Sequence, residues 1–339
     1  MLRNAVIMAG GEGKRLRPLT EHRPKPLMPL LDEPVIGMTL RLLRRHGLRE
    51  ATLAVCYRAE DIRNALGDGS GYGMELHYAV EETPRGTAGC VKDAAKHMQG
   101  TVLVLSGDGL TDADLTTLYQ RHAESGASLS MVTKRVADPT GYGVCETDAS
   151  GRVICFREKP SNAAKNSLVN TGIYFIEPEV LDLIPDTGAY DFGRELLPRM
   201  AAEGHLHALE TDAYWCDIGS RAAYARAQTD LLAGQVGLPV TGKRMGQAIM
   251  GKGCTIAPGV RFAGRCYIGD HVSIGRGTVI GGGTVIRPGA TVGASVRLEN
   301  ACLWENACID GGAILKNVVV MPQNGHSTLQ RIVMNGTQD

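Results

Sequence analysis

The sequence lacks an excess of charge of either sign. Lysine plus arginine and aspartate plus glutamate both number 36 in its 339 residues, so the formal net charge at pH 7 is zero. No overall electrostatic field favours nucleic acid or an anionic membrane surface, and we expect neither as a partner. Any binding of anions must therefore depend on a local cluster of basic side chains.

Long hydrophobic runs are also missing. No apolar stretch of about 18 residues occurs, and the opening MLRNAVIMAGG reaches glycine and charge too early for a secretory signal. We therefore expect a cytoplasmic protein. An apolar content of 43% is still enough to build a buried core in a chain of this length.

The cysteines and histidines lack the spacing of metal or disulfide sites. There are nine of each, yet no C-x-x-C, H-x-x-x-H or H-E-x-x-H pattern occurs. We expect reduced thiols and no metal bound by imidazole.

Short apolar runs alternate with longer amphipathic segments between residues 4 and 134. NAVIMA, ATLAVC and TVLVLSGD are typical of buried strands, whereas VIGMTLRLLRRHG and ADLTTLYQRHAES have helical spacing. The alternation predicts an α/β fold with a Rossmann-like mixed, mainly parallel sheet. Strand-like pieces between 142 and 217 should extend this sheet, and a helix ending near Gly234 should close a domain of residues 1–234.

A six-residue repeat follows. Bulky apolar side chains recur at Ile256, Phe262, Ile268, Ile274, Ile280, Ile286, Val292 and Leu298. A second row of small or medium side chains runs through Cys254, Val260, Cys266, Val272, Thr278, Thr284, Ala290, Val296, Cys302, Cys308 and Ile314.

Neither a helix nor a hairpin sheet has a period of six, but a parallel β-helix does. The repeat is similar to the left-handed β-helix in which three hexapeptides make one turn, and we expect it over residues 245–320. Both rows, including their four cysteines, should then fill the interior, while residues 321–339 should form a loose polar tail. Unpaired end coils of such a helix are usually covered, so we expect the repeat to serve assembly of a homo-oligomer.

The opening motif MAGGEGKRLRPLT fits neither common phosphate-binding fingerprint. With Gly11 and Gly13 as the first two glycines of G-x-G-x-x-G, the third position is Leu16, and a P-loop would need glycine instead of Met8. What remains is a glycine-rich turn after the first strand, whose backbone N–H groups can approach a phosphate closely. Four cations surround it: Lys14, Arg15, Arg17 and Lys25.

The stretch AGGEGKRLRPLTEHRPKPLMPL resembles the signature of the sugar-1-phosphate nucleotidyltransferases. EETPRGTAG, SGDGLTD, YGV, FREKP, NTGIYF and WCDIGS follow in that family's order, so the resemblance spans almost all of residues 5–220. A hexapeptide β-helix is a common appendage there, and the mannose-1-phosphate guanylyltransferases are the most similar branch. The sequence departs from the family pattern at Lys14, usually threonine, and at Arg85, usually leucine.

The resemblance implies transfer of a nucleotidyl group from a nucleoside triphosphate to a sugar 1-phosphate, with release of pyrophosphate. GTP and mannose 1-phosphate, giving GDP-mannose, are the expected substrates. Glucose-1-phosphate uridylyl, thymidylyl or adenylyl transfer stays open, as does a non-catalytic regulatory paralogue that binds nucleotide sugar. An acyltransferase using His271 is a further alternative, because hexapeptide β-helices also host that chemistry.

Two carboxylates are candidate Mg²⁺ ligands. Asp108 closes the strand TVLVLSGD and Asp217 closes AYWCDI, and two carboxylates from separate strands can hold this hard cation together with phosphates. Each aspartate alone also suits a helix cap. The resemblance further implies that Arg15 binds the leaving β- and γ-phosphates and Lys25 the α-phosphate.

The motif FREKP is a candidate sugar-phosphate site. By resemblance, Lys159 should bind the incoming phosphate and Glu158 the sugar hydroxyls. Because adjacent side chains of a strand point to opposite faces, both can face one ligand only if the chain bends at Pro160; an ordinary surface pair is the alternative. Asn170 should add hydrogen bonds, and Gly143 and Gly172 should let the sugar approach the backbone.

Nucleotide binding should involve the two glycine-containing motifs. The residues expected there are Gly10, Gly11, Gly13, Glu82, Gly86 and Thr87. Gly89 resembles the guanylyl branch, in which a small residue stands near the base, and Arg85 should lie at the rim of the base pocket.

Overall fold

The computed structural model describes residues 2–323 and 326–333, and the contacts divide the chain into two units. The first contains Met1–Lys14, Thr20–Met28 and Val35–Asp217, and the second contains Arg15–Leu19, Pro29–Pro34 and Ile218–Asp339. The boundary therefore falls before helix α7 (Arg221–Ala233), which we had expected to close the first domain at Gly234. Within the described ranges, no helix is long and apolar enough to cross a membrane.

The first unit contains a mixed sheet, as predicted. Its parallel half has the order β6-β1-β4-β5, with β1 (Asn4–Met8), β4 (Glu50–Val55), β5 (Glu75–Val80) and β6 (Val102–Ser106). The helices interleaved with these strands are α1 (Val35–Arg45), α2 (Ala59–Leu66) and α3 (Gly86–Ala94). Val6, Leu53 and Val104 are fully buried, as expected for parallel strands covered on both faces.

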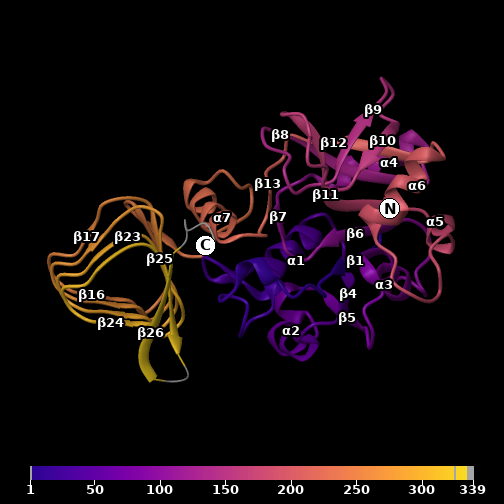
Figure 1. The fold of residues 1–339 in the computed structure, drawn as a ribbon. Helices are drawn as coiled ribbons and strands as arrows, with labels where there is room; N and C mark the ends of the chain where they lie inside the picture. Colours follow the sequence, from indigo (N-terminus) through magenta and orange to yellow (C-terminus); the bar gives the residue numbers. More distant parts are fainter. Residues whose placement is uncertain (1, 324–325, 334–339) are drawn as a thin grey trace. The chain divides into compact units, whose positions relative to one another are not determined.

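The other half of the sheet is built around the long strand β11, which runs antiparallel to β6 (Figure 1). Its strands are β8 (Leu129–Val136), β9 (Val144–Thr147), β10 (Val153–Arg157), β11 (Ser167–Ile176) and β12 (Leu206–Glu210). The helical segments here are α4 (Leu115–Ser125), α5 (Pro178–Asp182), the π-helix η4 (Phe192–Leu196) and α6 (Leu197–Ala202). β7 (Gly109–Thr111) and β13 (Trp215–Asp217) form a separate antiparallel pair.

The second unit is dominated by the predicted β-helix, whose coils are drawn in orange to yellow in Figure 1. Its strands are β14 (Lys243–Met245), β15 (Ala248–Met250), β16 (Thr255–Ile256), β17 (Arg261–Phe262), β18 (Cys266–Ile268), β19 (Ser273–Ile274), β20 (Val279–Ile280), β21 (Thr284–Ile286), β22 (Thr291–Val292), β23 (Arg297–Leu303), β24 (Cys308–Ile309) and β25 (Ile314–Gln323). Ile256 pairs with Ile274 and Phe262 with Ile280, three hexapeptides apart. The bulky row from Ile268 to Leu298 is buried, which confirms the predicted interior.

The last coil is one residue shorter, and this overturns part of the predicted second row. Ile286 pairs with Leu303 and Val292 with Ile309, so both rows move by one position after Leu298. The interior then takes the alternating pairs Ala301 and Leu303, and Ala307 and Ile309. Cys308 is consequently exposed, and the side chain of Ile314 is 73% exposed, although both had been placed inside.

One outer side of the β-helix is covered within its own unit. The ladder Ile249, Tyr267, Val285, Cys302 and Val319 points outward between interior residues and is nevertheless buried. Tyr224 of α7 lies there, with its hydroxyl 3.8 Å from Cys302 Sγ and donating to the carbonyl of Pro29 at 2.7 Å. This Pro29 belongs to the short hairpin of β2 (Pro29–Leu30) and β3 (Glu33–Pro34).

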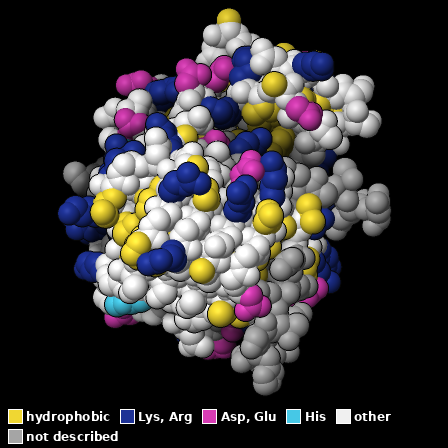
Figure 2. Space-filling view, turned by 90° about the vertical axis from the view of Figure 1, so that its left-hand side faces the viewer, with side chains coloured by type: hydrophobic (Ala, Val, Ile, Leu, Met, Phe, Trp, Pro, Cys, Tyr) yellow, Lys and Arg dark blue, Asp and Glu magenta, His cyan; other side chains and the backbone are white. Residues whose placement is uncertain are grey.

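Another side is open and carries cations. Arg261 of β17 and Arg297 of β23 are exposed on either side of Val279 of β20, with which both pair. Figure 2 shows lysine and arginine side chains spread among apolar ones, as on an ordinary solvated surface. The expected homo-oligomer stays a prediction.

The C-terminal segment is more ordered than predicted. β25 continues the β-helix in parallel with β23 and pairs antiparallel with β26 (His326–Val333). The expectation of a loose tail is therefore wrong for 326–333, whose backbone completes its hydrogen bonds by adding a strand. Positions 324–325 and 334–339 of the predicted tail lie outside the described residues.

Candidate functional site

The opening glycines and Asp108 lie at the same edge of the sheet. The glycine loop follows β1, and Asp108 follows the neighbouring parallel strand β6, while β4 and β5 lie on the other side of β1. The strand order thus reverses between β1 and β6, and ligands of such sheets bind at the carboxyl ends of the strands at this point.

Three charged side chains meet there from distant parts of the sequence. Lys25 Nζ forms an ion pair with Asp108 Oδ2 and another, at 3.1 Å, with Asp217 Oδ1. Asp217 reaches this place because β13 pairs with β7 in a register that sets it opposite Gly109. Two of the expected catalytic carboxylates and one expected cation are therefore joined in one cluster.

The cluster is strongly polarised. Burial lowers the pKa of Lys25, but Asp108 and Asp217 outweigh it, so that the pKa is raised above 10.5. Burial raises the pKa of Asp108, but the Lys25 ammonium and the hydroxyl of Ser106 outweigh this effect, so that the pKa lies below 3.8. The ammonium and the Asp108 carboxylate therefore keep their charges across the physiological pH range.

Glycine at position 13 makes room for this lysine. Gly13 has a φ of +66°, and a Cβ there would lie 3.0 Å from Lys25 Cβ. Its carbonyl accepts a hydrogen bond from the Thr20 hydroxyl at 2.9 Å, which closes the loop.

The residues present fit a magnesium ion. Both carboxylates reach the same Nζ atom, so their oxygens converge on one point, and one or two carboxylates with substrate phosphates are a common Mg²⁺ ligand set. No group of three or more His, Cys, Asp and Glu side chains gathers as metal ligands in the part of the chain that the structure describes. An ion here would therefore need oxygen atoms from substrate and water.

A cavity of about 340 Å³ adjoins the cluster. Ser106 links the two, because it lines the cavity and its hydroxyl donates to Asp108 Oδ1. The lining residues are Met8, Thr87, Ser106, Glu158, Lys159, Asn170, Gly172, Tyr174, Asp191, Phe192, Gly193 and Arg194. Five of these had been expected at the site: Thr87, Glu158, Lys159, Asn170 and Gly172.

The chain bends at the FREKP motif, as the shared site required. Lys159 has a φ of +47°, which breaks the strand alternation and lets two successive side chains line one cavity. Lys159 Nζ lies 2.9 Å from Glu158 Oε1, and the lysine side chain is 60% exposed. Its ammonium is thus available to a ligand anion.

Two glycines confine the Glu158 carboxylate. A Cβ on Gly143 would lie 2.8 Å from Glu158 Oε2, and one on Gly193 would lie 2.5 Å from the same atom. Gly143 had been expected to let sugar approach the backbone; here it makes room for Glu158. Gly193 lies between Phe192 and Arg194 of the π-helix and carried no motif in the sequence.

Asn170 is fixed by its own strand. Its Nδ2 donates to the Tyr174 hydroxyl at 2.7 Å, and its Oδ1 accepts from the Gly172 N–H at 2.9 Å. The pairing of β11 with β8 is interrupted between Asn170 and Tyr174, and this irregularity turns Asn170 toward the cavity. Gly172 has a φ of +76°, and a Cβ there would be 3.2 Å from Ser106 Cβ.

The expected nucleotide residues are placed less uniformly. A Cβ on Gly10 would lie 3.7 Å from Glu81 Oε2, whereas Glu82 is exposed. Burial raises the pKa of Glu81, and its Oε1 accepts from the Arg85 N–H at 2.9 Å. The carboxylate that faces the glycine loop is therefore that of Glu81, one residue before the predicted one. Gly11 is exposed.

Gly86 and Thr87, at the start of α3, contact Tyr190 and Asp191 of the protein itself. A Cβ on Gly86 would meet the Tyr190 nitrogen at 2.8 Å, and both the Thr87 N–H and its hydroxyl donate to Asp191 Oδ1. Arg15 lies exposed in the short helix η1 (Lys14–Leu16).

Seven of the cavity residues were not predicted as site residues from the sequence: Met8, Ser106, Tyr174, Asp191, Phe192, Gly193 and Arg194. The sequence DFGREL does contain three types typical of sugar-phosphate sites, an acid, a glycine and an arginine, within four residues. No periodicity distinguishes it, because the π-helix there follows neither of the regular patterns.

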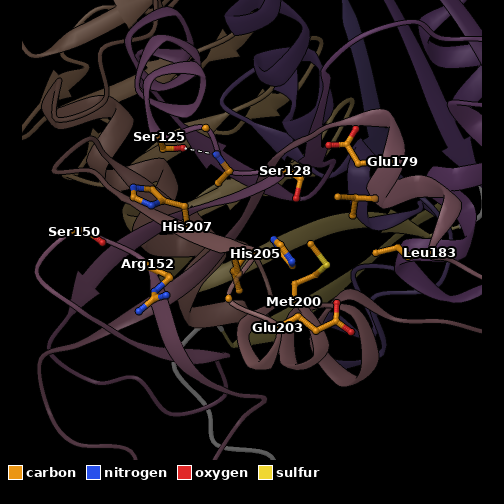
Figure 3. A pocket seen from close by; sticks show the side chains of 15 residues that line it. Ser125, Ser128, Ser150, Arg152, Glu179, Leu183, Met200, Glu203, His205 and His207 are labelled. Carbon is orange, nitrogen blue, oxygen red and sulfur yellow. Dashed lines mark hydrogen bonds between the residues drawn. The ribbon is translucent and has the colours of Figure 1, made fainter.

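A larger hollow of about 740 Å³ lies at the opposite edge of the sheet, where β8 and β12 begin. Arg152, His205 and His207 stand around it with several serines (Figure 3). It contains none of the expected site residues, so size alone does not locate the site.

Comparison with known proteins divides the chain after α7, near the predicted Gly234, although the contacts divide it before this helix. Residues 4–234 match the nucleotidyl transferase family model, and residues 247–282 match the bacterial transferase hexapeptide repeat. A UTP–glucose-1-phosphate uridylyltransferase of Synechocystis is 37% identical over 68% of this chain and 64% of its own length. A mannose-1-phosphate guanylyltransferase of Mycobacterium tuberculosis is 32% identical over 81% of this chain and 77% of its own length.

A solved structure supports the same grouping. HddC from Yersinia pseudotuberculosis, complexed with GMP-PN, is 25% identical, covers 68% of this chain and all of its own, and superposes with a TM-score of 0.59. Taken with the family match over residues 4–234, these likenesses show that the chain belongs to the nucleotidyl transferase family and carries hexapeptide repeats behind its transferase part.

Proposed function

We propose that the protein transfers a nucleotidyl group from a nucleoside triphosphate to a sugar 1-phosphate and releases pyrophosphate. The observation that carries this is the junction of two parts at one sheet edge. The cluster of Lys25, Asp108 and Asp217 adjoins, through Ser106, a cavity that presents Glu158 and Lys159.

The reaction needs positioning and charge more than proton transfer. A sugar phosphate is largely a dianion at neutral pH, because its second pKa is about 6, so its oxygen can attack the α-phosphorus without a base. The site offers Lys159 to the incoming phosphate, and Arg194 lines the same cavity as a second cation. Holding two polyanions in line and neutralising the charge on the transferred group are what such a transfer requires.

The sugar ring has its own candidate contacts. Glu158, confined between Gly143 and Gly193, can accept hydrogen bonds from hydroxyl groups, and Asp191 stands in the same lining. The cavity lining contains these two carboxylates, and its large apolar or aromatic side chains are limited to Met8, Phe192 and Tyr174. Such a lining favours a hydroxylated ligand over an acyl group.

We further propose that Asp108 and Asp217 hold Mg²⁺ once substrate phosphates enter. The ion would neutralise phosphate charge and orient the triphosphate. Lys25, which pairs with both carboxylates, would then bind the α-phosphate that the family resemblance assigns to it.

A readout without turnover tests the metal. In Lys25→Met the two carboxylates lose their shared cation and repel each other, so the melting temperature falls and is raised again when Mg²⁺ is added in the presence of GTP. Lys165→Met, at an exposed lysine, is the matched control. A Lys25→Met protein that gains no more from Mg²⁺ than the control does would refute the metal assignment.

We propose GTP and mannose 1-phosphate as substrates, in agreement with the guanylyltransferase relatives from Mycobacterium tuberculosis and, for a heptose 1-phosphate, from Aneurinibacillus thermoaerophilus. UTP with glucose 1-phosphate is the second candidate, because the Synechocystis relative has the higher identity of 37%.

Pyrophosphate release measured over a matrix of five nucleoside triphosphates and several sugar 1-phosphates decides between them. We expect the largest kcat/KM for GTP with mannose 1-phosphate. A maximum at UTP with glucose 1-phosphate would establish the second candidate, and no release with any pair would reject the transferase proposal.

A further inference from the structure

Arg85 stands in the motif that the sequence assigns to the nucleotide, but its guanidinium points to another segment. Nε, Nη1 and Nη2 donate to the carbonyl oxygens of Gly188, Asp186 and Pro185 at 3.1, 2.5 and 2.7 Å. The side chain is only 15% exposed, and Asp93 lies 3.3 Å from Nη1. All three nitrogens of the fork are therefore occupied by one loop.

The small residue at position 89 makes this arrangement possible. A Cβ on Gly89 would lie 2.9 Å from Arg85 Cβ and 3.4 Å from Nε. The stem of Arg85 thus lies over the first turn of α3, in space that any larger residue would take. Gly89 was expected to serve the choice of base, but here it accommodates the arginine.

The same loop is tied to α3 through its backbone. The Tyr190 N–H donates to the Arg85 carbonyl at 2.8 Å, and the Tyr190 carbonyl accepts from Ala88 and Gly89 at 2.9 and 3.0 Å. Two of the N–H groups that usually stay open at a helix start are therefore used by Tyr190, and a third, that of Thr87, by Asp191.

A second cation holds the loop at its beginning. Lys92 Nζ donates to the Ile184 carbonyl at 2.5 Å and lies 2.7 Å from Asp186 Oδ1. Two basic side chains, of α3 and its N-cap, thus bind four carbonyls within residues 184–188.

The clamped loop leads directly into the cavity. Asp191, Phe192, Gly193 and Arg194 follow it and line the 340 Å³ space with Lys159. The Phe192 N–H donates to the Thr87 hydroxyl at 2.9 Å. The orientation of Asp191 and Arg194 therefore depends on contacts with the segment 85–89.

We propose that Arg85 is a positioning residue for the sugar-phosphate cavity: by holding residues 185–188 it sets the place of Asp191–Arg194. The proposal rests on the proposed function for the identity of the ligand. Its consequence is that a residue of the nucleotide motif governs affinity for the other substrate.

Steady-state kinetics of the full chain test this with Arg85→Leu, Arg85→Lys and the exposed control Arg49→Leu. We expect Arg85→Leu to raise KM for mannose 1-phosphate by about tenfold, since three charge-assisted donors are lost, while KM for GTP changes less than about twofold. Arg85→Lys should be intermediate, because an ammonium cannot reproduce the planar fork. Arg49→Leu should leave both constants unchanged.

Amide hydrogen exchange of residues 184–194 gives a readout independent of turnover. We expect faster exchange there in Arg85→Leu, and in Arg85→Lys if the leucine variant does not fold. A rise in KM for GTP that equals or exceeds the rise for mannose 1-phosphate would overturn the proposal and place Arg85 in the base pocket. Unchanged exchange of residues 184–194 would also overturn the proposal. If the wild type turns over no substrate pair, the proposed function fails. The exchange result then still decides whether Arg85 holds residues 185–188 in place.

Discussion

The β-helix and the sheet-edge site use the sequence in opposite ways. In the β-helix, residues that touch are separated by three hexapeptides, so a local repeat specifies the contacts. In the site, Lys25 meets Asp108 and Asp217 across separations of 83 and 192 residues. The first region shows how a pattern encodes burial, and the second shows how a fold collects chemistry from single residues.

The two regions also differ in what their buried groups do. The β-helix interior is filled by aliphatic side chains such as Ile280 and Ile286. The site keeps an ammonium with 9% exposure between two carboxylates, which is costly unless the charges are paired. We therefore expect substitutions in the first region to change stability and those in the second to change turnover.

The largest expected effect is at the carboxylate pair. Asp108→Asn and Asp217→Asn should each lower kcat by at least about a hundredfold, because charge stabilisation in the transition state is lost. The double variant should be little worse than the poorer single one, since both act through one cluster. Asp182→Asn, at an exposed aspartate, is the control. Near-native turnover of both folded variants would show that the carboxylates have no catalytic role.

The second-largest effect is expected from a substitution that creates a cavity in the β-helix. Ile280 is fully buried, so Ile280→Ala should lower the free energy of unfolding of its unit by about 2–5 kcal/mol. Ile154→Ala, at a residue 56% exposed, is the matched control and should cost far less. Calorimetry distinguishes them, and equal losses would contradict the assigned interior. Truncation at Gly234 is a poorer test, because it would expose Tyr224 of α7.

Lys159→Ala sharpens the comparison within the site. It should raise KM for the sugar phosphate by roughly ten- to a hundredfold, as expected for one charge-assisted contact of about 1.5–3 kcal/mol. KM for the nucleotide should stay nearly constant, and Lys165→Ala is the neighbouring control. Equal weakening for both substrates would place Lys159 elsewhere in the reaction.

The smallest effect distinguishes the predicted and the observed register of the last coil. Cys302 is 1% exposed against Tyr224, so Cys302→Ser should cost about 1–3 kcal/mol, whereas Cys308→Ser, at an exposed position, should stay within about 0.5 kcal/mol. Chemical denaturation measures both. Matched losses would favour the unshifted row, in which both cysteines face the interior.

The outcome of sequence analysis follows this contrast. The interior row from Ile268 to Leu298 was predictable because one period fixes every member. The one-residue shift after Leu298 was not, because it shows only in the structure, where Ala301 and Leu303 are the buried interior pair. A bend in EKP was named in advance as the condition under which Glu158 and Lys159 could share one ligand, and the structure has it at Lys159. Asp191 and Arg194 were not predicted, because loop 184–188 and segment 85–89 position them, and no local pattern encodes that contact.

The most direct test of this division measures kcat and the unfolding profile together for Asp108→Asn and Ile280→Ala. The account predicts that Asp108→Asn loses at least about a hundredfold in kcat while its β-helix unfolds as in the wild type, and that Ile280→Ala loses stability while the folded protein keeps near-native kcat. If Ile280→Ala lost turnover as severely as Asp108→Asn while still folded, chemistry would not be confined to the sheet edge, and the account would be wrong.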